Sequence, residues 1–193
     1  MSAEKKGQTE RVIGERKMVL RFLILAVALA GACGIPRTAV SQGNSPVPID
    51  VAHHKASEAY FRLFEAKQTW QKAREIAHQT KYHGRQGRLA IIDTPEKHQF
   101  VLETFDFGRR NYANIIWIGL RYWCSFRALM WVNGNELKQG GFSVWTSPWY
   151  RSDVRCGQAN IDYMGVYYNA QNRWQAAGQR KLGDHFLVEY PTS

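Results

Sequence analysis

The sequence lacks the short motifs that mark common catalytic sites. It has no Gly-rich phosphate loop, no Gly-x-Ser-x-Gly nucleophile turn and no His-Glu-x-x-His pair. Its six histidines are not spaced as zinc ligands are. Cys156 together with Asp184 and His185 could be parts of a thiol-dependent enzyme site, but a structural role for these residues is the simpler interpretation. The sequence therefore favours a protein that is not an enzyme.

The sequence also lacks a hydrophobic run long enough to cross a bilayer. A membrane-spanning helix needs about 20 apolar residues, and the apolar run over residues 22–29 is much shorter. Basic residues precede this run and small residues follow it, a pattern typical of a signal peptide. We predict that residues 1–42 form an export signal with a preceding polar extension, whether the natural start is Met1 or Met18.

Two routes of processing fit this export segment. Cys33 follows small residues and resembles the lipidated cysteine of bacterial lipoproteins, whereas ordinary cleavage after a small residue such as Ala32 is the alternative. Residues 43–56 contain glycine and prolines and are predicted to be a flexible tether. We therefore expect an exported protein that is secreted, periplasmic or membrane-anchored at the cell envelope.

Charge and composition limit the partners. The net charge is +10 at pH 7, but the basic residues are scattered along the chain. Scattered charge is typical of a solvated surface, so we expect no nucleic-acid partner. Attraction to an anionic envelope surface fits equally well. Aromatic residues make up 13% of the chain, and a buried large side chain contributes about 1.5–3 kcal/mol, so a stable core can form.

The hydrophobic pattern predicts an α+β domain. Helical spacing indicates a helix over 68–80, and Thr94 followed by Pro95 predicts the start of a second helix that ends near Gly108. The predicted strands cover 59–66, 89–92, 115–120, 129–132, 166–169, 173–175 and 186–190, with a long irregular stretch over 135–165. Because the strands follow one another without alternating helices, an antiparallel sheet is favoured.

Several motifs resemble the C-type lectin-like domain family in order and spacing. They are Trp70 with Ala73, the runs 87–92 and 117–120, Met130 to Gly134, Trp145, Trp174 and the run 186–189. The resemblance implies a C-type-lectin-like fold over residues 57–193, with two helices packed on antiparallel strands and a long loop region. Within it, the tryptophans are expected in the core, and Gly119 is expected to allow close backbone approach.

The resemblance also shows where the usual disulfides are missing. One family bridge would join positions that hold Ala77 and Val188 here, and the second would need a cysteine where Gln179 stands. If Cys33 is removed or lipidated, Cys124 and Cys156 remain as an even pair in an oxidising compartment. We hypothesise that these two form a bridge of their own.

The calcium positions of the family are altered as well. Sugar-binding members hold Ca²⁺ with carboxylate and amide oxygens, and Ca²⁺ needs six to eight oxygen ligands. The matching positions hold Ser147-Pro148-Trp149 in the loop, Arg155 before the loop cysteine, and Gln175-Ala176 after the late tryptophan. We therefore predict that no calcium and no other cofactor binds here.

The long loop instead offers aromatic and arginine side chains, which are over-represented in binding hot spots. Our candidate ligand-binding residues are Trp149, Tyr150, Arg151, Asp153 and Tyr163. The preferred function is a non-catalytic, calcium-independent recognition module of an exported protein that binds a protein or a carbohydrate. The alternatives are a lipid-anchored structural envelope protein and, less favoured, a thiol-dependent enzyme.

Overall fold

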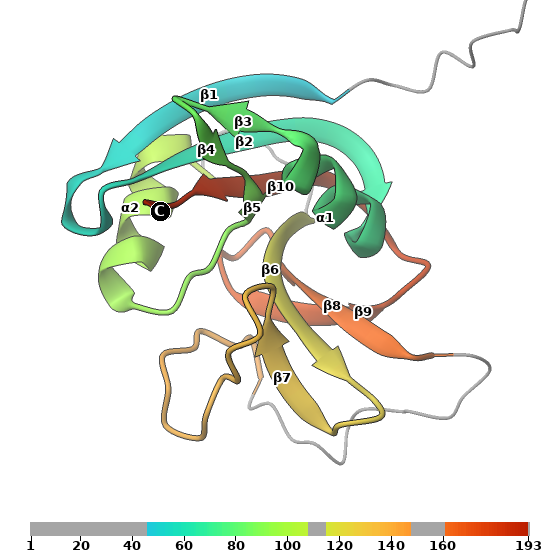
Figure 1. Cartoon of the computed structure of the whole chain (residues 1–193). Coiled ribbons are helices and arrows are strands. Elements are labelled where there is room, and N and C mark those ends of the chain that lie inside the picture. Colours follow the sequence, from blue (N-terminus) through green and yellow to red (C-terminus); the bar gives the residue numbers. More distant parts are fainter. Residues whose placement is uncertain (1–45, 108–114, 148–160, 193) are drawn as a thin grey trace, which may run out of the picture. The chain divides into compact units, whose positions relative to one another are not determined.

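The two ends of the folded region meet in one sheet (Figure 1). The computed structural model describes residues 46–107, 115–147 and 161–192, and all of these belong to the unit that spans residues 41–193. The predicted export signal, with Cys33, therefore lies outside the described residues. Within these three ranges, no helix is long and apolar enough to cross a membrane.

The main sheet has eight strands, in the order β1-β2-β10-β6-β8-β9, with β5 paired to β10 and β7 paired to β6. The strands are β1 (Val47–His54), β2 (Ala59–Thr69), β5 (Arg88–Leu89), β6 (Ile116–Trp123), β7 (Ala128–Trp131), β8 (Tyr163–Tyr168), β9 (Trp174–Gly178) and β10 (Leu182–Tyr190), with β3 (Lys81–Tyr82) and β4 (Arg85–Gln86) in a separate two-stranded sheet. All pairs are antiparallel except β6 with β10. The predicted α+β fold, with two helices on a mostly antiparallel sheet, is confirmed.

Strand β1 corrects the prediction of a flexible tether over residues 43–56. From Val47 to His54 the chain pairs antiparallel with β2, and it continues through the short 3-10 helix η1 (Lys55–Ser57). Pro48 makes this strand hard to predict, because proline lacks the N–H that a central strand needs and occurs in sheets mainly at edges or bulges. Strand β1 is such an edge, and its register shifts between Pro48 and Asp50.

Both α-helices begin with a threonine cap. The hydroxyl of Thr69 accepts a hydrogen bond from the N–H of Lys72, the third residue of α1 (Trp70–Gln79). The hydroxyl of Thr94 accepts one from the N–H of Lys97, the third residue of α2 (Pro95–Phe105). The predicted start at Thr94 is therefore confirmed. Helix α2 ends at Phe105, slightly before the predicted end near Gly108, because Asp106 adopts a left-handed conformation with φ of 50°.

The core is built around tryptophans. Trp70, Trp117 and Trp174 are fully buried, as the motifs predicted. The indole N–H of Trp70 donates to the Ile118 carbonyl at 2.7 Å, and that of Trp117 donates to the Gln68 carbonyl at 2.8 Å. These two bonds join α1 and the end of β2 to β6, so they hold the strand that carries the site described below.

Gly119 allows the close approach that the sequence predicted. A Cβ atom on this residue would lie 2.6 Å from the Leu89 carbonyl oxygen and 3.0 Å from a methyl carbon of Val132. The strand predicted over 89–92 is only two residues long in the structure, where Arg88 and Leu89 form β5. Beyond them, Ala90 makes two separate backbone hydrogen bonds: its N–H donates to the Leu187 carbonyl, and its carbonyl accepts from the Gly119 N–H.

Candidate ligand-recognition surface

Most of the predicted ligand-binding residues lie outside the part of the chain that the structure describes. Trp149, Tyr150, Arg151 and Asp153 lie outside the described residues, as does Cys156. Of the five candidates, the structure describes only Tyr163, which opens β8 and so ends the predicted irregular stretch three residues early. Tyr163 lies beside side chains that the sequence analysis did not single out.

The centre of this group is Arg121 on β6. Its guanidinium carbon lies 3.6 Å from the ring centroid of Trp123, 4.8 Å from that of Trp70 and 5.7 Å from that of Tyr163. A cation within about 6 Å of an aromatic centroid is attracted by the ring face. We call Arg121 and these three rings the Arg121 cluster.

Strand geometry explains why these side chains meet. Arg121 and Trp123 are two residues apart on β6, so they lie on the same face of the sheet. Tyr163 is the direct antiparallel partner of Trp123, and the two ring centroids are 5.8 Å apart. The partner of Arg121 is Gly165, where a Cβ would lie only 2.7 Å from Trp70. The missing side chain of Gly165 therefore leaves the space that Trp70 fills.

The electrostatics of the cluster are unusual for a surface arginine. Burial and the nearby charge of Arg74 lower the pKa of Arg121 to about 10. Arg121 is still fully charged at neutral pH, because that value lies well above 7. Burial raises the pKa of Tyr163, so its hydroxyl stays neutral. In the part of the chain that the structure describes, Arg121 takes part in none of the ion pairs.

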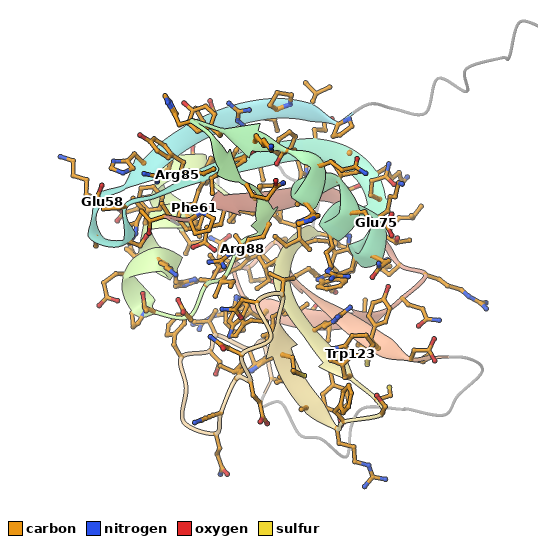
Figure 2. All side chains as sticks on the ribbon, viewed as in Figure 1. Glu58, Phe61, Glu75, Arg85, Arg88 and Trp123 are labelled. Atoms are coloured by element: carbon orange, nitrogen blue, oxygen red, sulfur yellow. The ribbon has the colours of Figure 1, made fainter. Side chains whose placement is uncertain are left out.

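An exposed ring extends the cluster. Phe126 lies in the turn between β6 and β7, is 69% exposed, and meets Trp123 edge to face at 6.2 Å between centroids. Figure 2 shows Trp123 near the β6–β7 end of the domain, away from Glu58 and Arg85. We call the Arg121 cluster together with Phe126 the recognition surface. Its arginine and Trp123 were missed because the predicted strand ended at Leu120.

Cys124 lies in the same turn and is disulfide-bonded. The other two cysteines of the sequence, Cys33 and Cys156, are both outside the described residues. The predicted Cys124–Cys156 pairing therefore stays a prediction. The backbone N–H of Cys124 donates to the Asp162 carbonyl at 3.0 Å, so this cysteine lies beside the chain that enters β8.

The positions of the family disulfides are occupied by other contacts. Ala77 and Val188 are both fully buried in the same apolar cluster, so packing replaces that bridge. Gln179 stands at the predicted place of the other missing cysteine, and its side-chain oxygen accepts a hydrogen bond from the Asp162 N–H at 3.0 Å. A hydrogen bond therefore links the end of β9 to the start of β8.

The described part of the calcium position does not fit a cation. The amide oxygen of Gln175 accepts a hydrogen bond from the Tyr167 hydroxyl at 2.7 Å, and Ala176 has no side-chain oxygen. Among the residues described, no group of three or more His, Cys, Asp or Glu side chains could hold a metal ion. The loop half of this position, including Pro148 and Trp149, lies outside the described residues.

A family model of the lectin C-type domain matches residues 66–181, more than half of the chain. The chain belongs to the C-type lectin domain family. The resemblance seen in the sequence is therefore confirmed. Domains of this family are typically non-catalytic binding modules that act outside the cell and bind carbohydrate or protein ligands.

Solved structures show the same fold. The C-type lectin CEL-I from Cucumaria echinata is 14% identical, with a TM-score of 0.55 over 74% of this chain and 96% of that one. Human lithostathine is also 14% identical, with a TM-score of 0.55 over 76% and 100% of the two chains. The carbohydrate-recognition domain of cow CD23, solved in the presence of a GlcNAc2Man3 oligosaccharide, is 20% identical, with a TM-score of 0.51 over 70% and 89%. No curated protein sequence matches the chain.

Proposed function

We propose that this C-type lectin domain is a calcium-independent recognition module of an exported protein, and that it binds carbohydrate through the recognition surface. The observation that carries the proposal is the packing of Arg121 against three aromatic rings. Trp149, Tyr150, Arg151 and Asp153, which lie outside the described residues, stay predicted contributors.

The chemistry of the recognition surface suits a sugar chain. Aromatic faces stack on sugar rings, and an arginine presents five N–H donors in a fixed fork to hydroxyl or acidic oxygens. The guanidinium carbon of Arg121 packs 3.6 Å from the Trp123 ring centroid, and this contact restricts the side chain before a ligand arrives, so less side-chain freedom is lost on binding. Phe126 adds an exposed apolar face at the same edge. A carbohydrate is favoured over a protein partner because the donors of Arg121 lie beside aromatic rings, on which sugar rings can stack.

Independence from calcium is supported by the described ligand positions. Ala176 offers no side-chain oxygen, and the side-chain oxygen of Gln175 already accepts a hydrogen bond from Tyr167. A Ca²⁺ ion with six to eight oxygen ligands would lose two of its usual protein ligands there. The proposal is that recognition relies on ring stacking and arginine donors, with no metal bridging the sugar.

A glycan array run in EDTA and again in calcium tests the proposal. We expect the same glycans to bind in both buffers, and Trp123→Ala to weaken them at least about tenfold, as loss of a hot-spot residue does. Tyr82→Ala is the matched control, because Tyr82 also stacks with an arginine, Arg62, at 4.7 Å, but from strand β3. Binding only in calcium, or equal loss in both variants, would refute the proposal.

A further inference from the structure

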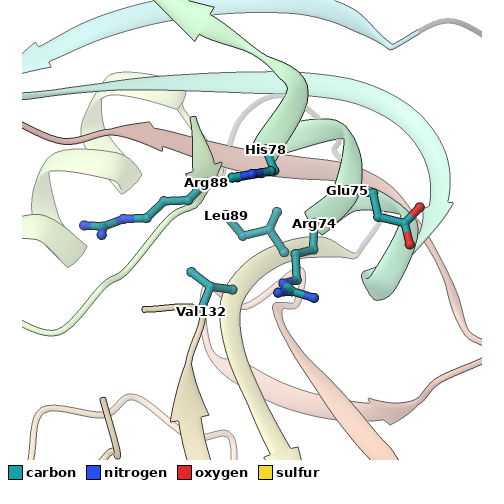
Figure 3. Close-up of a pocket in the computed structure, with 6 residues that line it drawn as sticks. All are labelled: Arg74, Glu75, His78, Arg88, Leu89 and Val132. Atoms are coloured by element: carbon teal, nitrogen blue, oxygen red, sulfur yellow. The ribbon is translucent and has the colours of Figure 1, made fainter. Parts of the chain in front are cut away.

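A pocket opens beside the recognition surface, between α1, β5 and the chain after β7. Its volume is about 290 Å³, and it is lined by Arg74, Glu75, His78, Arg88, Leu89 and Val132 (Figure 3). Leu89 and Val132 give it an apolar floor, while α1 supplies Arg74, Glu75 and His78 and β5 supplies Arg88. The pocket is large enough for a sugar unit or an acidic substituent of one.

Most of the charged groups around the pocket are engaged elsewhere. Glu75 accepts hydrogen bonds from Gln71 and Lys72 on its own helix. Arg88 donates to buried Glu189 at 3.0 Å. In Figure 3 the Glu75 carboxylate and the Arg88 guanidinium point away from the pocket on opposite sides, whereas the Arg74 guanidinium lies beside Leu89.

Arg74 connects the pocket to the Arg121 cluster. Trp70 and Arg74 are four residues apart on α1, so they share one face of the helix. The guanidinium of Arg121 lies 4.8 Å from the Trp70 ring, and the charge of Arg74 lowers the pKa of Arg121. Two arginines from different elements therefore face one region of surface.

This pair of like charges is only partly offset within the described ranges, where the charge of Arg74 favours the ionised carboxylate of Glu75 and contributes to lowering its pKa. Neither Arg74 nor Arg121 belongs to any of the ion pairs found there. Two nearby cations repel each other, and partial burial strengthens that repulsion because the local dielectric is low. An anion bound between them would remove this cost, and perturbed arginines in such a setting are typical of functional sites.

We propose that Arg74 and Arg121 form an anion subsite, and that the ligand is an acidic polysaccharide whose sulfate or carboxylate groups bind there while its sugar rings lie on Trp123 and Tyr163. This inference rests on the proposed function and narrows its ligand class. A sugar chain is favoured over an acidic peptide because the arginines adjoin aromatic faces on which rings can stack. Arginine is suited to both acidic groups, since its fork binds their oxygens in pairs.

Three probes with one backbone test the inference on the full chain: dextran sulfate, carboxymethyl dextran and neutral dextran. Affinities are measured by biolayer interferometry at low and at physiological salt. We expect at least one acidic form to bind about tenfold or more tightly than neutral dextran, and the difference to shrink as salt screens the charges. The preferred acidic form identifies the group that the subsite takes.

Variants then locate the effect. Arg74→Gln and Arg121→Gln should each weaken acidic dextran about tenfold, the loss typical of one hydrogen-bonded charge pair. Arg62→Gln is the control, because it removes the same charge from an arginine that also lies over an aromatic ring. Arg121→Lys keeps the charge and the fold, so it should retain part of the binding. Circular dichroism and Tm confirm that each variant is folded.

The outcomes separate this inference from the proposed function. If neutral and acidic dextran bind alike, or if Arg74→Gln behaves as Arg62→Gln does, the anion subsite is refuted, while glycan binding that depends on Trp123 would leave the proposed function standing. If polyglutamate binds as tightly as acidic dextran and with the same variant profile, the polysaccharide assignment is overturned. If no glycan depends on Trp123, the proposed function itself is wrong.

Discussion

Replacing Gly119 by alanine should unfold the domain more easily, because this glycine stands where β6 passes against the backbone that follows β5. The new Cβ would lie 2.6 Å from the Leu89 carbonyl oxygen, well inside the 3.4 Å at which ordinary contact begins. The Leu89 carbonyl is not free to turn away, because the backbone on both sides of the contact is held by hydrogen bonds. The Gly119 N–H donates to the carbonyl of Ala90, the residue after Leu89, and the Gly119 carbonyl accepts from the Val132 N–H, both at 2.8 Å. Backbone on both sides must move by several tenths of an ångström.

Overpacking of this kind costs about 1–3 kcal/mol, and the obstruction by backbone places Gly119→Ala in the upper half of that range. Urea unfolding followed by tryptophan fluorescence measures the free energy of unfolding. Gly178→Ala is the control, because the nearest atom to its Cβ is a methyl carbon of Ile161 at an ordinary 3.8 Å. That variant should change stability by less than about 1 kcal/mol. Equal stability of the two variants would refute the reasoning.

Two further predictions concern the buried Glu189 and the half-buried His98. Glu189→Gln should lower the free energy of unfolding by about 3 kcal/mol, the lower end for breaking a buried ion pair. The reason is that the Glu189 carboxylate lies 3.0 Å from Arg88, whose side chain is 31% exposed, and 3.6 Å from Lys97. A decrease of less than about 0.5 kcal/mol in urea unfolding would contradict this. Burial and nearby Arg173 lower the pKa of His98 from its usual 6.5, so the unfolded chain takes up the proton first and stability should fall as the pH drops below 6.5. His98→Gln should reduce this fall in Tm between pH 7.5 and 5.5, and an unchanged fall would rule out His98 as a source.

The sequence was most informative where a local rule decides the structure. Thr94 followed by Pro95 specifies the start of α2 by capping alone, and the predicted close approach at Gly119 follows from the absence of a side chain. Strand β1 was missed because Pro48 normally breaks strands, and only its place at the sheet edge makes it acceptable. Whether a strand lies at an edge depends on the whole topology, which local patterns do not contain.

The recognition surface could not be predicted for a similar reason. Arg121, Trp123 and Tyr163 come together through the register of β6 against β8, and Trp70 reaches them because Gly165 lies opposite Arg121. Each residue alone fits an ordinary strand or helix. A period-two pattern extended past Leu120 would have placed Arg121 and Trp123 on one face, but it would not have identified the helix residue that completes the cluster.

The disulfide of Cys124 bears directly on how the recognition surface works. Cys124 follows Trp123 at once and lies beside the entry to β8. We predict that its partner is Cys156, because that residue belongs to the loop segment just before β8 and Cys33 belongs to the predicted export signal. Such a bridge would tie the loop with Trp149 and Tyr150 to the edge of the recognition surface.

Peptide mapping of the unreduced mature protein by mass spectrometry checks the pairing, and we expect a linked peptide that contains Cys124 and Cys156. A bridge between these positions closes a loop of about 33 residues, which is worth about 3–4 kcal/mol in the chain-entropy model. Cys124→Ser should therefore lower Tm and, by releasing the loop, weaken glycan binding beyond what the loss of stability explains. Two free thiols in the unfolded, unreduced protein would refute the pairing. Unchanged binding by a folded Cys124→Ser variant would show that the loop does not contribute to recognition.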